Sequence, residues 1–359
     1  MWKIWSSVLI WLHFAEKFSV VPNPYSDQVG VVLYRCLVIL MSSCRQLSAP
    51  LRYASTRPST AFHLEEDISD PSKLLAAYVG SIGSIGAGDR APNYIAGSGN
   101  AGYQDGRAAM FDEITGFAQV SGNIVLIADH GNNCIRKVDR QQGLTSTAAG
   151  KCGDTGWRDG SLGNSRFSQP YNIIKSFTGN NTFFVTDHNN HAIREINLDS
   201  GNVSTFLKDE DNLYFPIAMV IDNTHYKMFV TMRYSVVSIG LDSKRIQKLS
   251  DNRGDKIALM RPGVIIITDN PRDYYLRNRK RSVITQIDTT SGNVTSRDVL
   301  LWPHENQYPR SLFYNLTENT LYISERDIIV SLEVTCKYFQ IIRKMVAAAT
   351  TQSPIAITS

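Results

Sequence analysis

The chain has 359 residues, of which 43% are hydrophobic and 19% are charged, and its formal net charge is +4. The hydrophobic fraction supports a sizeable core and excludes a wholly disordered protein. A net charge this small falls short of the basic footprint of a nucleic-acid-binding domain. The 24 glycines, 16 tyrosines and 14 phenylalanines favour a turn-rich β protein.

The first 45 residues predict a signal peptide or a membrane anchor. Lys3 precedes the apolar run from Ile4 to Phe14, which has the length and charge order of a secretory signal. A second apolar run, from Val29 to Met41, is interrupted by Arg35 and is shorter than the roughly 20 residues of a membrane-spanning helix. We therefore expect residues 1–45 to direct export or to tether the chain to a membrane.

Two further segments are predicted to lie outside the folded domain. Residues 46–73 are polar and include an acidic step from Glu65 to Asp67, so we expect a disordered linker. Residues 337–359 begin amphipathically and end in a polar run, which indicates a short helix and then a disordered tail. The folded domain is therefore predicted over residues 74–336.

Residues 94–206 contain the same pattern twice. Asp129 and Asp187 each end an apolar run, and an Ile-Arg pair follows each of them at a common offset of 58 residues. Similar runs end at Met232, Asp269 and Glu325. Repeats of about 40–50 residues with short apolar strands and Gly, Asn and Pro turns are typical of four-stranded propeller blades. Such blades bury their faces only against one another and therefore close into a ring.

The second copy resembles the NHL-repeat β-propeller family. That family has an acid, then Asn-His, and then Ile-Arg. The corresponding residues here are Asp187, Asn190, His191, Ile193 and Arg194, whereas the first copy has Asn133 in place of the histidine. The resemblance is clear over residues 94–206 and weaker to about residue 332. It implies an all-β propeller of six four-stranded blades, of which five are visible in the sequence and the sixth could come from residues 74–88.

The repeated motif residues are predicted to build the scaffold and not to catalyse. Asparagine in a tight turn tolerates the left-handed conformation and bonds its own backbone. The isoleucine that follows faces the core, and the arginine can reach back across the turn to the acid. The predicted structural residues are Asp129, Asn133, Ile135 and Arg136 in the first copy and Asp187, Asn190, His191, Ile193 and Arg194 in the second.

Cys134 and Cys152 point to a disulfide. Both occur in the first copy, and at the offset of 58 the second copy has Ala192 and Glu210. Two cysteines that form a disulfide are expected to occur together in one copy and to be missing together from the other. Such a bond would contribute on the order of 3 kcal/mol by constraining the unfolded chain. Two independent buried thiols are the alternative.

Four sequences of the form Asn-X-Ser/Thr provide acceptors for N-glycosylation. Their asparagines are Asn180, Asn202, Asn293 and Asn315. Asn202 and Asn293 belong to a repeated SGNV turn, so turn chemistry alone is the alternative explanation for them. With the signal-like start and the disulfide, these acceptors favour an extracellular or cell-surface protein.

Evidence for catalytic chemistry is weak. His130 and His188 occupy equivalent positions in the two copies, with His191 nearby, so a shared metal site is geometrically possible. A repeated histidine in a turn is more often a turn residue than a ligand. No nucleophile elbow, phosphate loop or dinucleotide fingerprint occurs. We therefore expect no catalytic residue, no metal and no other cofactor.

An insertion at residues 270–282 carries the chain's one basic cluster. We interpret it as a solvated loop that could contact a partner; a dibasic processing site, a polyanion contact and RNA stacked on its tyrosines are the alternatives. The residues concerned are Tyr274, Tyr275, Arg277, Arg279, Lys280 and Arg281.

The sequence as a whole favours a secreted or cell-surface propeller that binds a protein or glycan ligand and not nucleic acid. One alternative is a metal-dependent lyase or hydrolase with its site in the central channel. A second alternative is an RNA-binding NHL propeller.

Overall fold

The computed structural model describes most of the repeat region, and it is an all-β protein. The described residues are 51–52, 61–86, 89, 91–177, 179, 181–251, 254–268, 282–291, 294–300, 310–318, 320–325 and 328–333. The predicted signal or anchor segment, the basic cluster at residues 270–281 and the tail at residues 337–359 lie outside them. Within this described part, no helix has the length and apolar character needed to cross a membrane.

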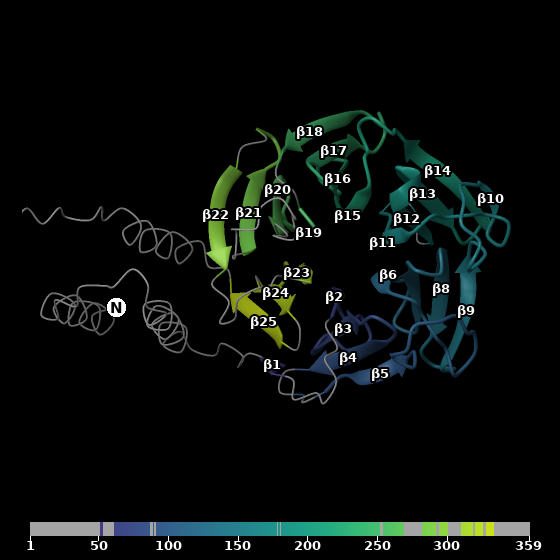
Figure 1. Cartoon of the computed structure of the whole chain (residues 1–359). Helices are drawn as coiled ribbons and strands as arrows, with labels where there is room; N and C mark the ends of the chain where they lie inside the picture. Colours follow the sequence, from purple (N-terminus) through teal and green to yellow (C-terminus); the bar gives the residue numbers. More distant parts are fainter. Residues whose placement is uncertain are drawn as a thin grey trace, which may run out of the picture. The chain divides into compact units, whose positions relative to one another are not determined.

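Six antiparallel sheets, five with four strands and one with five, follow one another around a ring (Figure 1). The first blade contains β2 (His63–Glu66), β3 (Lys73–Ala77), β4 (Ile82–Gly86) and β5 (Asn93–Ala96). The second contains β6 (Ile114–Gln119), β7 (Ile124–Asp129), β8 (Cys134–Asp139) and β9 (Leu144–Ala149). The third contains β11 (Pro170–Lys175), β12 (Thr182–Asp187), β13 (Ala192–Asn197), β14 (Asn202–Lys208) and the short β10 (Gly160–Ser161).

The remaining three blades complete the ring. The fourth contains β15 (Pro216–Asp222), β16 (Lys227–Met232), β17 (Val236–Gly240) and β18 (Ile246–Ser250). The fifth contains β19 (Lys256–Arg261), β20 (Val264–Thr268), β21 (Ser282–Asp288) and β22 (Val294–Leu300). The sixth contains β23 (Ser311–Asn315), β24 (Thr320–Glu325), β25 (Ile328–Glu333) and β1 (Leu51–Arg52). A short 3-10 turn, η1 (His188–Asn190), follows β12.

The ring is closed by strands from opposite ends of the chain. Leu51 and Arg52 of β1 pair with Ile329 and Ile328 of β25, so the earliest strand becomes the outermost strand of the last blade. In the other blades the innermost strand comes first in the chain, except in the third blade, where the outermost strand β10 precedes the innermost strand β11. Each inner strand contacts the inner strands of both neighbouring blades. This pairing leaves the propeller without a break at the junction of its last and first blades.

Hydrophobic clusters fill the spaces between neighbouring blades, and β7 shows why. Leu126 and Ala128 point into the cluster shared with the third blade, which includes Phe183 of β12. Val125 and Ile127 belong instead to the cluster shared with the first blade. Both faces of this strand are therefore buried, which explains a continuous apolar run in place of alternation. Full burial of each large side chain contributes about 1.5–3 kcal/mol.

The all-β propeller predicted from the sequence is confirmed, but the start of the domain differs. β1 and β2 lie within residues 46–73, which the sequence indicated as a disordered linker. The sequence of β2 is polar because β2 is an inner strand that lines the central cavity: Leu64 is buried, whereas His63 and Glu65 are only partly buried. The extra blade that the sequence suggested at residues 74–88 is the first blade, in which β3 and β4 are joined by β2 and β5. One blade also has a fifth strand, β10, where four were expected.

Candidate functional site: the central channel and its upper mouth

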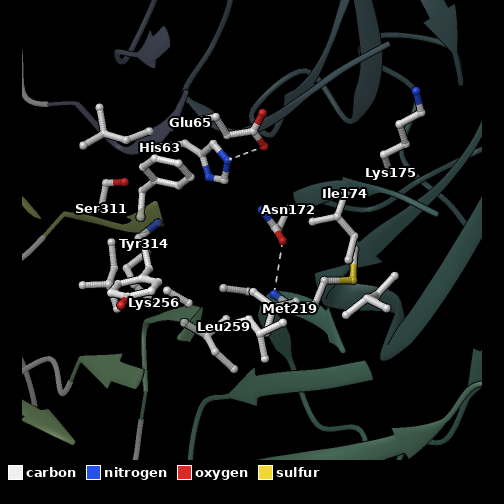
Figure 2. Close-up of a pocket in the computed structure, with 18 of the residues that line it drawn as sticks. His63, Glu65, Asn172, Ile174, Lys175, Met219, Lys256, Leu259, Ser311 and Tyr314 are labelled. Carbon is white, nitrogen blue, oxygen red and sulfur yellow. Dashed lines mark hydrogen bonds and ion pairs between the residues drawn. The ribbon is translucent and has the colours of Figure 1, made fainter. Parts of the chain in front are cut away.

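The six inner strands surround a cavity of about 570 Å³, shown in Figure 2. Residues from β2, β6, β11, β15, β19 and β23 line it, and most of its wall is apolar, for example at Met219, Ile257, Leu259 and Leu312. A cavity of this volume lies within the usual range of small-molecule sites. We call the end at which the inner strands begin the upper end, and the end at which they finish the lower end.

The lower part of the channel carries two carboxylates held in a hydrogen-bonded network. The amide of Gln119 donates to Oε2 of Glu65 at 3.1 Å and to the backbone oxygen of Glu66 at 2.7 Å. Nδ2 of Asn315 donates to Oε2 of Glu66 at 3.2 Å. Nε2 of His63 lies 3.4 Å from Oε1 of Glu65. These contacts tie together three blades and place negative charge in this part of the channel.

The wall between the third and fourth blades is fixed by buried polar contacts. Oδ1 of Asn172 accepts a hydrogen bond from the backbone of Met219 at 3.1 Å, which Figure 2 marks. The backbone of Asn172 donates to Oγ1 of Thr186 at 2.8 Å, and that hydroxyl donates to the carbonyl of Ile217 at 2.9 Å. Because each contact joins an inner strand to a neighbour, the wall is rigid at this point.

A buried lysine, Lys256, lies at the upper end of the channel. It is the first residue of β19, lines the cavity and is only 9% exposed. Its Nζ lies 5.3 Å from the ring centre of Tyr171 on β11. Among the described residues, no carboxylate lies within ion-pair distance of this ammonium group. Burial lowers the pKa of Lys256 to about 8, and the nearby Asp255 and Glu113 only partly offset that effect.

Two histidines lie beside Tyr171 at the same end. The ring centres of His130 and His188 lie 5.4 Å and 5.7 Å from that of Tyr171, and 6.5 Å from each other. Burial lowers the pKa of His188 to about 4, although its Nδ1 lies 2.9 Å from the carbonyl of Pro216. Burial also lowers the pKa of His130, with the carboxylate of Glu113 opposing the effect. Both rings are therefore neutral at pH 7.

The backbone around this upper mouth is strained at a repeated position. Glu113, Gln169 and Phe215 directly precede β6, β11 and β15, and their φ angles are +60°, +54° and +49°. A left-handed conformation at a residue with a side chain costs on the order of 1 kcal/mol or more and is kept where the surroundings impose it. Because this conformation recurs in three consecutive blades, it belongs to the repeated turn before each inner strand.

A tyrosine platform extends from the mouth to the surface; we use this name for His191, Tyr214 and Tyr234. The ring of Tyr214 stacks on that of His191 at 5.0 Å and on that of Tyr234 at 6.3 Å. Phe215 contacts His188 and His191 and so connects the platform with the channel. Tyr214 and Tyr234 are 43% and 57% exposed. The platform therefore offers aromatic surface to a partner.

The repeated arginines form buried ion pairs with the acids of their motifs. Arg136 donates to Asp129 at 2.8 Å and also contacts Asp105. Arg194 donates to Asp187 at 2.9 Å and to Asp159 at 2.6 Å. Both arginines and both motif acids are fully buried. Burial raises the pKa of Asp187 to about 6, so this carboxylate is ionised at pH 7.

The other motif residues contribute to the turns and to the core. Ile135 and Ile193 are fully buried. Nδ2 of Asn190 donates to Oδ2 of Asp187 and to the carbonyl of Gly156 in the loop between β9 and β10, both at 2.8 Å. Asn133 and His191 adopt left-handed conformations, with φ of +58° and +53°. All these contacts lie within the scaffold.

The predicted disulfide between Cys134 and Cys152 is confirmed. It joins β8 to the loop after β9, with a distance of 5.0 Å between the Cα atoms. Cys134 is fully buried in the second blade. The bond thus anchors the loop that leads from the second blade toward the third.

The structure shows the surroundings of the three histidines that the sequence singled out. No group of three or more histidine, cysteine, aspartate or glutamate side chains in the described part of the chain could hold a metal ion. Nδ1 of His188 is engaged by the carbonyl of Pro216, and Nδ1 of His191 accepts a hydrogen bond from the backbone of Phe215. His130 and His188 instead contribute their rings to the upper mouth.

The glycosylation acceptors differ in their surroundings. Asn202 is exposed at the start of β14. Asn315 is only 6% exposed, and its amide nitrogen donates to Glu66 while its oxygen accepts from the backbone of Thr317 and Glu318. Asn315 is thus used in a buried turn. Asn180 and Asn293 lie outside the described residues.

Sequence reasoning singled out the histidines of this site but missed Lys256 and Tyr214. Lys256 pairs with Thr268 at the place where Pro216 pairs with Met232, so aligning the blades by strand register would have revealed a lysine at the channel mouth. Tyr214 directly precedes Phe215 and Pro216, an aromatic pair before a proline that starts an inner strand. The partner-loop candidates Tyr274, Tyr275, Arg277, Arg279, Lys280 and Arg281 lie outside the described residues.

This ring of sheets around a channel defines a β-propeller. No protein-family model matches the chain, and a comparison with curated proteins finds no match. Among solved structures, it is similar to a catalytically inactive virginiamycin B lyase from Staphylococcus aureus with quinupristin, at 13% identity and a TM-score of 0.52, over 80% of this chain and 99% of that one.

Two further structures are similar. The hydrazine synthase of Kuenenia stuttgartiensis has 16% identity and a TM-score of 0.51, over 75% of each chain. A nidogen/laminin complex has 15% identity and a TM-score of 0.49, over 70% of this chain and 84% of that one. Identities this low show a shared fold and nothing about function.

Proposed function

We propose that this protein is an exported propeller of NHL type that serves as a binding scaffold for a partner protein. The observation that carries the proposal is the exposed tyrosine platform at the upper mouth. Tyr214 and Tyr234 present aromatic surface beside Arg233, whose guanidinium lies 5.5 Å from the ring centre of Tyr234. Tyrosine and arginine are the residue types that contribute most to binding at protein interfaces.

Export is supported by observations that are independent of the platform. The Cys134–Cys152 bond is typical of an oxidising compartment. The signal-like sequence at residues 1–45 and the exposed acceptor Asn202 agree with it. The NHL assignment is supported by the acid, Asn-His and Ile-Arg order of the second copy.

The proposal can be tested by site-specific photo-crosslinking in extracellular fluid. A crosslinking amino acid at Tyr234 is expected to capture one protein reproducibly, and Tyr214→Ala is expected to reduce that capture about tenfold or more, as for a residue that contributes strongly to binding. Tyr226 is the matched control because it is 55% exposed and lies in the β15–β16 turn at the lower end. Equal capture from both positions, or capture of glycan only, would contradict the proposal.

A lyase or hydrolase acting in the channel is the second candidate. It is favoured by His130, whose Nδ1 has no hydrogen-bond partner among the described residues, beside the neutral His188. The structurally similar virginiamycin B lyase is an enzyme on the same fold. Turnover of an ester or lactone substrate that is lost in His130→Asn, but retained in Tyr234→Ala, would favour this candidate over the scaffold.

A further inference from the structure

Lys256 is a buried cation, and no carboxylate of the described residues lies within ion-pair distance of it. Its Nζ lies 5.3 Å from the ring centre of Tyr171. Burying a charge without an ion pair is costly, and proteins otherwise avoid it. By contrast, the buried Arg136 and Arg194 each face two carboxylates. Among the described residues, these two arginines are thus neutralised by carboxylates, whereas Lys256 has no such ion pair.

The charged groups around Lys256 do not replace a direct partner. Asp255 and Glu113 act on its pKa from a distance and raise it, whereas Arg310 lowers it. Burial outweighs them all, so the amine has a pKa of about 8 and is still largely protonated at pH 7. A negatively charged group placed next to the ammonium group would form the ion pair that offsets the cost of burying it.

The rest of the cavity defines what else such a ligand contains. Below Lys256 the wall is formed by apolar side chains of β15, β19 and β23, including Met219, Ile257 and Leu312. At the lower end, Glu65 and Glu66 carry negative charge and would repel a second anionic group. The cavity therefore favours a molecule with an apolar body and a single negative charge at its upper end.

We propose that the central channel binds a small organic carboxylate, with its carboxylate against Lys256 and its apolar body along the inner strands. This site is separate from the tyrosine platform, and the inference does not depend on the proposed partner protein. Tyr171 would pack beside the carboxylate, and the volume of about 570 Å³ leaves room for the body.

The probe is octanoate, with octanol as its uncharged match, titrated into the purified full chain by calorimetry. Octanoate is expected to bind at one site and octanol at least about tenfold more weakly, because a neutral hydroxyl can accept a hydrogen bond from Lys256 but cannot form an ion pair with it. Octanoate binding is also expected to weaken as the pH rises above about 8, where Lys256 loses its proton. Octanoate and octanol binding equally, or octyl phosphate binding more tightly than octanoate, would overturn the proposal.

Variants assign the effect to one side chain. Lys256→Met and Lys256→Gln are both expected to reduce octanoate affinity about tenfold to a hundredfold. Lys175→Met is the matched control: Lys175 also lines the channel, but at the lower end of β11, where its Nζ donates to the carbonyl of Val120. Tyr234→Ala should leave octanoate binding unchanged, which separates this site from the partner surface. Unchanged affinity in folded Lys256 variants would contradict the proposal.

Discussion

Asn133 and His191 make the same hydrogen bond in consecutive blades. Oδ1 of Asn133 accepts the backbone N–H of Gln169 at 2.8 Å, and Nδ1 of His191 accepts the backbone N–H of Phe215 at 3.1 Å. Each donor is the left-handed residue directly before the next inner strand. The asparagine that departs from the family pattern in the first copy therefore performs the same structural task as the histidine in the second.

This equivalence predicts that the two residue types can be exchanged and that neither can be removed. Asn133→His and His191→Asn should each change the free energy of unfolding by less than about 1 kcal/mol. Asn133→Ala should lower it by about 1–3 kcal/mol, because it removes a hydrogen bond and places alanine in a left-handed conformation. Denaturant unfolding of the three variants measures this, and equal losses in all of them would refute the equivalence.

The buried arginines predict a larger effect. Arg194→Met should lower the free energy of unfolding by about 3–5 kcal/mol, because it leaves Asp187 buried without its ion pair. Arg166→Met is the matched control, since Arg166 pairs with the half-exposed Asp154 and should lose about 1 kcal/mol or less. Chemical denaturation separates the two. A loss in Arg194→Met no greater than the control's would show that this ion pair does not stabilise the fold.

The repeated blades could be predicted from the sequence because the residues that form their turns lie close together in the chain. Asp187, Asn190 and Arg194 lie within eight residues, and their contacts close within one turn and its neighbouring strand. Cys134 and Cys152 could be paired because a second copy provided a comparison without them. These features recur at fixed spacing, so the repeat itself identifies them.

The site could not be predicted because it depends on the closure of the ring. Lys256 and Tyr171 are separated by two blade positions around the channel and meet only when all six inner strands converge. The polar sequence of β2 was interpreted as a linker because an inner strand that lines a cavity needs only one apolar side. That cavity exists only in the closed ring. The pairing of β1 with β25 joins residues near opposite ends of the chain, and no local pattern indicates it.

The low pKa of His188 predicts that the protein loses stability on acidification. In the folded state this pKa is about 4, below the ordinary value of 6.5, so between those values the unfolded chain binds more protons than the folded one. The stabilisation is therefore complete above pH 6.5 and is lost as the pH falls toward 4, by on the order of 3 kcal/mol. Asp187, whose pKa is raised to about 6, acts in the opposite direction.

His188→Phe isolates this contribution. The variant should show a shallower fall in unfolding free energy between pH 6.5 and 4 than the wild type, whatever its stability at pH 7. Thermal and denaturant unfolding across that range provide the measurement. Parallel pH profiles for the two proteins would mean that His188 is not the group that titrates.

The two described glycosylation acceptors predict different outcomes if the protein is exported. Asn202 is exposed and should carry a glycan on chains secreted from eukaryotic cells. Asn315 should stay unmodified, because its amide nitrogen is bonded to Glu66 and its oxygen caps a turn, so the folded protein offers no acceptor there. Enzymatic deglycosylation in isotopically heavy water followed by peptide mapping distinguishes the two asparagines. A label at Asn315 would mean that the glycan is attached before the sixth blade closes on β2, whereas no label at either asparagine would contradict export through the secretory pathway.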